Sequence, residues 1–157
     1  SGILVWRKEK LLQNFQSYRK RNDPLSTGKS KFARIVMQTI NLEEKFSSFK
    51  KHWHPHQIAV VDNMQVLLAK LKDEFVWHKH DEEDELFFVQ KGILEMHFRD
   101  KIEIISEGEI IIVPKGVEHC PKTQNGEEVH VLLFEKLSTK HTGNITSEKT
   151  VSEYPKI

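Results

Sequence analysis

The sequence predicts an all-β domain, a small sandwich or barrel, over residues 41–137. Short segments rich in Ile, Val, Leu and Phe recur along this region, and turn signals such as Lys91-Gly92 and Asn125-Gly126 separate them. Apolar and polar residues alternate in one of them, as a sheet with one wet face requires. No long helix interrupts the series, which excludes a parallel βαβ sheet. The predicted strands are 57–61, 64–72, 85–90, 93–98, 102–105, 109–113 and 129–137.

A short helix is expected at the start of this domain. Asn41 stands three residues before Glu44, a spacing typical of a capping box. Leu42, Phe46 and Phe49 then share one helical face. The helix is expected to close at the Trp-His-Pro segment that follows.

Residues 1–40 form a basic N-terminal arm. The first 36 residues hold nine Lys/Arg and two acidic residues, a net charge of +7, whereas the remainder holds 15 basic and 21 acidic residues, a net charge of −6. Apolar residues recur at roughly helical spacing over 4–20, which predicts a helix there. A solvated arm or a helix packed on a partner subunit explains this charge better than nucleic-acid binding. The polar residues 138–157 are expected to form a C-terminal tail packed on the barrel.

Composition narrows the cellular setting. The single cysteine, Cys120, rules out an intramolecular disulfide and fits a reducing compartment. No apolar run approaches the roughly 18 residues that a membrane span needs. No signal peptide is visible. We therefore expect a cytoplasmic protein without a membrane segment.

The first segment with candidate metal ligands contains His78, His80 and Glu85. Side chains alternate faces along a strand, so the two histidines point the same way and can hold one metal ion. A loop follows, and Glu85 begins the next predicted strand, where its carboxylate can return to the same ion. Gly92 marks the end of that hairpin.

The second segment runs from Gly108 to His119. A glycine turn, an apolar strand and the turn Pro114-Lys115-Gly116 precede the histidine and bring a third imidazole across the barrel. Three imidazoles and one carboxylate suit iron, manganese, nickel, cobalt, zinc or copper, and do not suit calcium or magnesium.

Together the two segments resemble the paired motifs of the cupin superfamily. The first matches H-x-H-x4-E-x6-G from His78, and the second matches G-x5-P-x-G-x2-H from Gly108. The sequence departs from the family pattern at Lys72, where a leading glycine is usual, and at Thr123, where an asparagine is usual. The tail near residue 143 is similar to that of small single-domain cupins of the mannose-6-phosphate isomerase-like group.

The resemblance, which covers roughly residues 57–137, implies a single-domain jelly-roll β-barrel and usually a homodimer. It also implies one divalent transition metal ion, iron, manganese, nickel or zinc, inside the barrel. The ligands would be His78, His80, Glu85 and His119.

The interior around such an ion is expected to be apolar. Strand alternation places five residues there as pocket-lining candidates: Val76, Phe87, Val89, Met96 and Phe98. The sequence offers few interior acids or bases beyond the four ligands. The upstream run of three alternating histidines, residues 52–56, lacks a following carboxylate and glycine and is interpreted as a segment leaving the helix.

Function is less determined than fold, because this fold carries many reactions. The leading hypothesis is a metalloenzyme that acts on a small polar metabolite as an isomerase, dioxygenase or lyase. The alternative is a non-catalytic module that binds or senses a small ligand. A structural dimer with a vestigial metal is the third hypothesis. A phosphosugar substrate is disfavoured, since Lys70 and Lys72 are the only basic candidates to hold a phosphate and are more often solvent-facing.

Overall fold

The computed structural model describes residues 39–143 and 145–157 of the 157-residue chain. One compact unit spans Thr39–Ile157. The helix predicted over 4–20 and most of the basic arm lie outside the described residues. Among the described residues, no helix has the length and apolar composition that crossing a membrane requires.

Helix α2, Leu42–Ser47, opens the described part. The Asn41 side chain caps it by accepting a hydrogen bond from the Glu44 backbone N–H at 3.2 Å. Phe46 and Phe49 are buried and cluster with Leu68 of the sheet below. The cap and the apolar face are as predicted, but the helix ends at Ser47 and not near Trp53.

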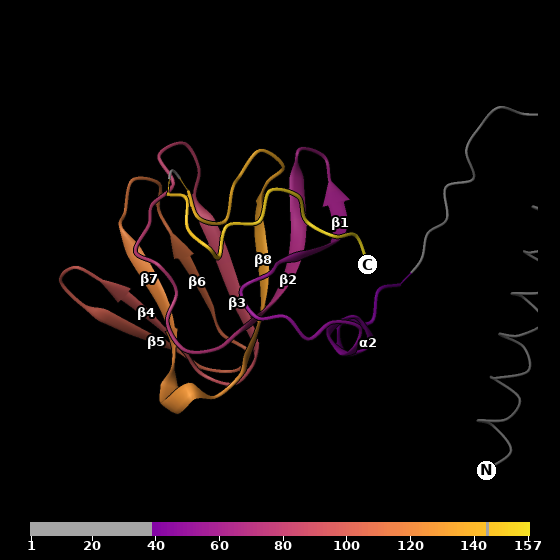
Figure 1. Ribbon diagram of the computed structural model, residues 1–157, viewed down its shortest axis with the longest axis horizontal. Helices are drawn as coiled ribbons and strands as arrows, with labels where there is room; N and C mark the ends of the chain where they lie inside the picture. Colours follow the sequence, from indigo (N-terminus) through magenta and orange to yellow (C-terminus); the bar gives the residue numbers. More distant parts are fainter. Residues whose placement is uncertain (1–38, 144) are drawn as a thin grey trace, which may run out of the picture. The chain divides into compact units, whose positions relative to one another are not determined.

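Within the described residues, eight strands form two antiparallel sheets that face each other as a jelly-roll barrel (Figure 1). The larger sheet has the order β1-β2-β8-β3-β6 and the smaller one the order β5-β4-β7. Seven of the strands match the predicted segments within one or two residues at each end, which confirms the all-β prediction. The strands are β1 His56–Val61, β2 Met64–Leu71, β3 Glu85–Lys91, β4 Leu94–Phe98, β5 Ile102–Ile105, β6 Ile110–Val113, β7 His119–Thr123 and β8 Val129–Lys136.

The sequence did not predict β7. Pro121 lies in its middle, and a proline removes one donor from a ladder, so prolines are confined to edge strands. β7 is indeed an edge strand of the smaller sheet, with β4 as its strand partner and two isolated bridges, Glu74–Lys122 and His78–His119, on its other side. A five-residue strand with a proline and little alternation leaves no strand signal in the sequence.

The core lies between the inner faces of the two sheets. Val89 and Val131 of the larger sheet and Leu94 and Met96 of the smaller sheet are 0% exposed. These residues occupy alternate positions along their strands, because successive side chains of a strand point to opposite faces. These apolar side chains therefore fill the space between the two sheets.

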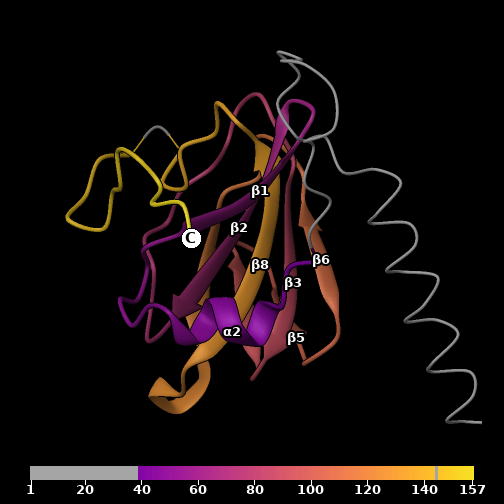
Figure 2. The same ribbon diagram turned by 90° about the vertical axis from the view of Figure 1, so that its right-hand side faces the viewer.

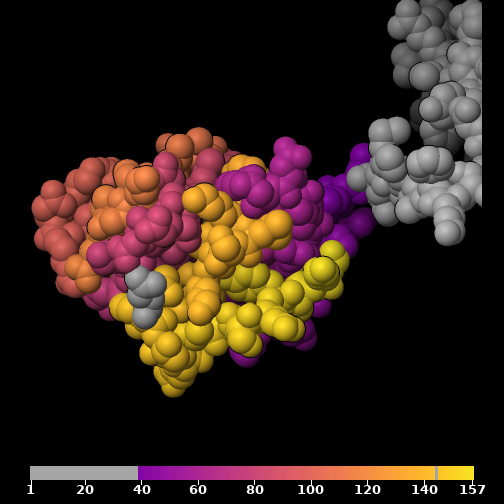
Figure 3. Space-filling view, turned by 90° about the horizontal axis from the view of Figure 1, so that it is seen from above, coloured from indigo at the N-terminus to yellow at the C-terminus, as the bar shows by residue number. Residues whose placement is uncertain are grey.

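The C-terminal residues lie against the strands (Figures 2 and 3). The Gln57 backbone N–H donates to the Pro155 carbonyl at 2.8 Å, and the Ile157 N–H donates to the Gln57 carbonyl at 3.1 Å. The Tyr154 hydroxyl accepts from the His141 backbone N–H at 2.9 Å. These bonds hold the segment across one opening of the barrel.

Candidate metal centre

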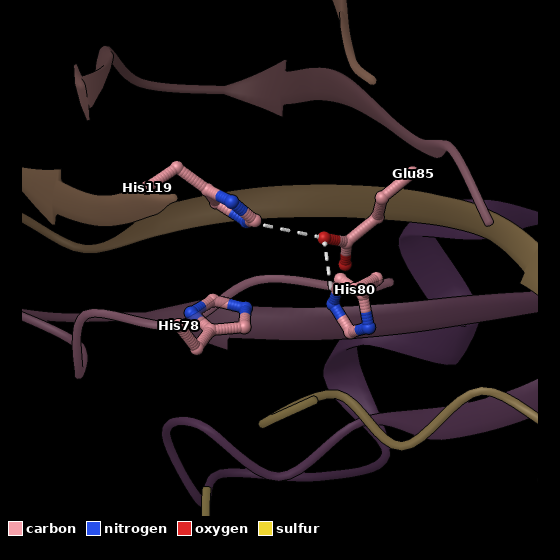
Figure 4. A group of neighbouring side chains, drawn as sticks. All are labelled: His78, His80, Glu85 and His119. Atoms are coloured by element: carbon pink, nitrogen blue, oxygen red, sulfur yellow. Dashed lines mark ion pairs between the residues drawn. The ribbon is translucent and has the colours of Figure 1, made fainter. Parts of the chain in front are cut away.

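Three short pieces of chain bring the four predicted ligands together. His78 and His119 face each other in an isolated antiparallel bridge, in which each backbone N–H donates to the other carbonyl, at 3.0 and 2.9 Å. His80 lies two residues beyond His78, and Glu85 is the first residue of β3. The four side chains converge on one point (Figure 4).

Two hydrogen bonds join the loop between His80 and Glu85 to the turn that precedes His119. The Lys115 backbone N–H, in the turn before His119, donates to the Asp84 side chain at 3.0 Å. The neighbouring Gly116 N–H donates to the His80 carbonyl at 2.6 Å. The Pro-x-Gly turn therefore fixes both the loop that carries His80 and the start of β3.

The donor atoms are close together and shielded from water. One ligand atom from each of the four residues lies within 4.8 Å of the others. His78, His80, Glu85 and His119 are all buried, at 2%, 5%, 2% and 0% exposure. A buried group of four metal-ligating side chains is what a structural or catalytic ion requires. We name these four residues the candidate metal centre.

Backbone carbonyls orient two of the imidazoles. Nδ1 of His78 lies 3.0 Å from the Val76 carbonyl, and Nδ1 of His119 lies 3.0 Å from the Val117 carbonyl. A carbonyl can only accept, so each Nδ1 carries a proton, and in the neutral imidazole Nε2 then offers a lone pair. This arrangement is typical of metal-binding histidines, whose second nitrogen donates to the surrounding protein.

The centre has donor atoms that the described residues leave without partners. Nε2 of His80 and of His119 and Oε2 of Glu85 are buried and have no hydrogen-bond partner. Oε2 of Glu85 nevertheless lies 3.3 Å from Nε2 of His80 and 3.4 Å from Nε2 of His119. Two atoms that bind one ion at about 2.1 Å each lie roughly 3.0–3.4 Å apart. The separations of Oε2 of Glu85 from the two Nε2 atoms are thus those expected of atoms that bind one cation.

The surroundings of His78, Glu85 and His80 shift the pKa values of these side chains. Burial, and next the neighbouring His119, lower the pKa of His78 to about 4. Burial favours the neutral form of Glu85, but contacts with His119 and His80 outweigh it and lower its pKa to about 2. Burial also opposes charge on His80, yet Glu85 and the loop carboxylates raise its pKa. At neutral pH His78 is neutral and Glu85 is ionised, which are the forms that bind a metal.

A small cavity of about 30 Å³ adjoins the centre. Phe87, one of the five predicted pocket residues, lines it together with Trp53, Phe75 and His141. A cavity of this size holds a water molecule or a similarly small group. The tail residue His141 forms part of its wall, a contribution that no sequence pattern indicates.

The other four predicted pocket residues lie elsewhere. Val89 and Met96 belong to the closed core, and Phe98 packs against that core and borders the groove between β5 and β6. Val76 is half-buried, and its backbone carbonyl accepts a hydrogen bond from Nδ1 of His78. Strand alternation predicts the face on which each side chain lies but not its distance from the candidate metal centre.

The interior holds one more acid than the sequence analysis recognised. Glu135 on β8 is 0% exposed, and burial together with the charge of Glu85 raises its pKa. It shares the inward face with Val129, Val131 and Leu133, so alternation within this strand could have found it. Its hydrogen-bond partner Gln65 shares the inward face of β2 in the same way.

Neither the upstream histidines nor the cysteine belongs to the centre. His52 Nε2 lies 2.8 Å from Glu128, and His56 stacks on Phe49 with ring centroids 4.0 Å apart. Cys120 is buried, and burial raises the pKa of its thiol to about 11. A thiol with such a pKa is protonated at neutral pH and is a poor nucleophile.

Comparison with known proteins agrees with this geometry. The protein-family model of the cupin domain matches residues 65–135. The uncharacterized protein YdbB of Bacillus subtilis is 31% identical over 91 residues, which cover 57% of this chain and 74% of YdbB.

Two solved structures are also similar. A cupin-2 domain containing protein from Shewanella frigidimarina is 42% identical, with a TM-score of 0.60, over 62% of this chain and 93% of the other. A protein from Neisseria meningitidis is 33% identical, with a TM-score of 0.57, over 63% of this chain and 99% of the other. This chain belongs to the cupin superfamily.

Proposed function

We propose that this protein binds one divalent transition metal ion, iron, manganese, nickel or zinc, and uses it to transform a small polar metabolite. Four buried donor atoms converge within 4.8 Å, and three of them have no hydrogen-bond partner in the described part of the chain, which supports this proposal. The reaction would be that of an isomerase, a dioxygenase or a lyase. His78, His80, Glu85 and His119 would be the ligands.

When bound, such an ion supplies Lewis-acid catalysis or a binding position for dioxygen. The protein's own residues do the remaining work. The carbonyls of Val76 and Val117 keep two imidazoles in the orientation that a ligand needs. Aromatic side chains around the cavity, among them Phe75 and Phe87, exclude bulk water from one side of the centre. The small cavity favours a small reacting group.

Elemental analysis of protein purified without added metal or chelator tests the proposal. We expect about one iron, manganese, nickel or zinc per chain, since the ligand set suits these ions. Protein that contains no metal and takes up none on addition would contradict the proposal. Stoichiometric metal without turnover in a metabolite screen, run with and without oxygen, would favour a non-catalytic binding module.

We also propose that two copies associate through the outer groove between β5 and β6. Both are edge strands of their sheets, and each exposes two isoleucines, Ile102 and Ile104 on β5 and Ile110 and Ile112 on β6. Their exposure is 50–59%. Edge strands carry unpaired backbone groups, and a two-fold axis brings a strand antiparallel to its own copy. The charges beside the groove, such as the Lys101–Glu103 pair, include both signs and so do not repel a second copy.

An Ile110→Lys variant is expected to shift a dimer toward the monomer in sedimentation velocity, because it places a charge in the apolar contact. Val60→Lys is the matched control, since Val60 is 50% exposed on the edge strand β1 at the other end of the sheet. Dissociation by Val60→Lys alone would place the interface at β1.

The cytoplasmic location stays a prediction from the sequence.

A further inference from the structure

His141, in the C-terminal tail, borders the cavity that adjoins the candidate metal centre. His78 and Glu85, two of the proposed ligands, line the same cavity. Apart from these three residues, the described side chains in its walls are aromatic, aliphatic or proline. An ion would occupy the donor atoms of His78 and Glu85. His141 is then the polar side chain of the wall that is left to meet a ligand in the cavity.

The tail holds the imidazole of His141 in one orientation. The His141 backbone N–H donates to the Tyr154 hydroxyl at 2.9 Å, and the His141 ring packs against Phe75, with ring centroids 5.7 Å apart. Nε2 of His141 lies 2.9 Å from the Lys149 backbone carbonyl. A carbonyl can only accept, so Nε2 carries a proton and donates it to Lys149.

The other ring nitrogen of His141 lacks a partner. Nδ1 is buried and has no hydrogen-bond partner among the described residues. The two nitrogens of an imidazole point in different directions, so Nδ1 is directed away from the Lys149 carbonyl. Burial lowers the pKa of His141, which agrees with a neutral ring and a lone pair on Nδ1. A buried acceptor left unpaired costs stability, and the cavity is the space from which a donor can reach it.

We propose that His141 is a specificity-determining residue, whose Nδ1 accepts a hydrogen bond from a hydroxyl group of the metabolite bound at the metal centre. The cavity of about 30 Å³ has room for one such group and not for a longer substituent. A site that hydrogen-bonds a hydroxyl rejects an analogue without it, because its own buried polar atom is then left unpaired. This inference rests on the proposed metal binding, and it assigns the substrate to small hydroxylated metabolites.

Two probes that differ by one hydroxyl group, glycolate and acetate, test the inference. Each is titrated into cobalt-substituted protein, and its Kd is taken from the absorption spectrum of the bound cobalt. His141→Phe keeps an aromatic ring and removes both nitrogens. We expect this variant to raise the Kd of glycolate about 5–10-fold and to leave the Kd of acetate within about 2-fold of wild type, the effect of one lost hydrogen bond.

Two further variants separate the two nitrogens. The side-chain amide of asparagine lies near the position of Nδ1, whereas that of glutamine lies near the position of Nε2. His141→Asn should therefore keep most of the glycolate affinity, and His141→Gln should lose it as His141→Phe does. If His141→Phe does not fold, this pair of variants still decides between the two nitrogens.

Thr150→Val is the control for a loosened tail. Oγ1 of Thr150 lies 3.1 Å from Oγ1 of Thr142 and accepts a hydrogen bond from the Ser147 backbone N–H at 2.9 Å. The valine removes both contacts and leaves the imidazole unchanged. It should lower the thermal midpoint and keep the wild-type Kd for glycolate.

The alternative outcomes are distinct. A wild-type glycolate Kd in His141→Phe, which is the result if Nδ1 meets only a bound water, would overturn the inference. Equal rises for glycolate and acetate, or the same loss in Thr150→Val, would also overturn it, and all three results leave the four ligands intact. Failure of wild-type protein to bind cobalt would instead overturn the proposed function on which the inference rests.

Discussion

Alanine at His78 or at His119 should reduce the bound metal from about one ion per chain to nearly none. Each variant removes one of four donors and leaves the Glu85 carboxylate, which is 2% exposed, with fewer neighbours to offset its charge. Loss of one protein ligand from a four-ligand site removes most of the affinity. Inductively coupled plasma mass spectrometry on dialysed protein measures the content directly.

His97→Ala is the matched control for these variants. His97 is a half-buried histidine of β4 whose Nε2 lies 2.8 Å from Glu95 and which takes no part in the candidate metal centre. Its replacement should leave metal content unchanged. Full metal content in the His78 and His119 variants would show that the ion is held by other residues.

The Gly143→Ala substitution is expected to weaken metal binding, although Gly143 is not one of the proposed ligands. A Cβ atom at Gly143 would collide with the backbone carbonyl of Lys79, the residue between His78 and His80. The Gly143 φ of +55° also disfavours any residue with a side chain. We expect a loss of about 1–3 kcal/mol in stability and a roughly 10–100-fold rise in the metal Kd, because the His78–His80 segment must shift.

Gly108→Ala separates the collision from the backbone strain. Gly108 has a φ of +86°, but an added Cβ atom there meets nothing within 4 Å. It should lower the thermal midpoint modestly and leave the metal Kd unchanged. An equal effect of both substitutions on metal affinity would contradict the proposed contact between the tail and the His78–His80 segment.

The two positions at which the sequence departs from the family pattern, Lys72 and Thr123, lie near each other in the fold. The Thr123 hydroxyl accepts a hydrogen bond from the Asp73 backbone N–H at 2.9 Å, and Asp73 itself adopts a positive φ of 63°. The residue next to the expected glycine thus makes the left-handed turn, and Asp tolerates this conformation better than most residues. Neither departure disturbs the four ligands.

The sequence by itself determined the class of fold and the four residues of the candidate metal centre. Alternation places His78 and His80 on one face, and the spacing of turn residues fixes seven strands, because both signals are local. The N-cap at Asn41 is equally local. Residues related by short, regular spacing can be assigned without knowledge of the fold.

Only the tertiary structure decided which distant groups meet. β7 forms because β4 offers it a partner, although Pro121 weakens its own strand signal. Glu135 is next to Glu85, and Gly143 is next to Lys79, through contacts between residues about 50 and 64 positions apart in the sequence. Such neighbours depend on strand order and on the path of the tail, neither of which is encoded in any short stretch of sequence.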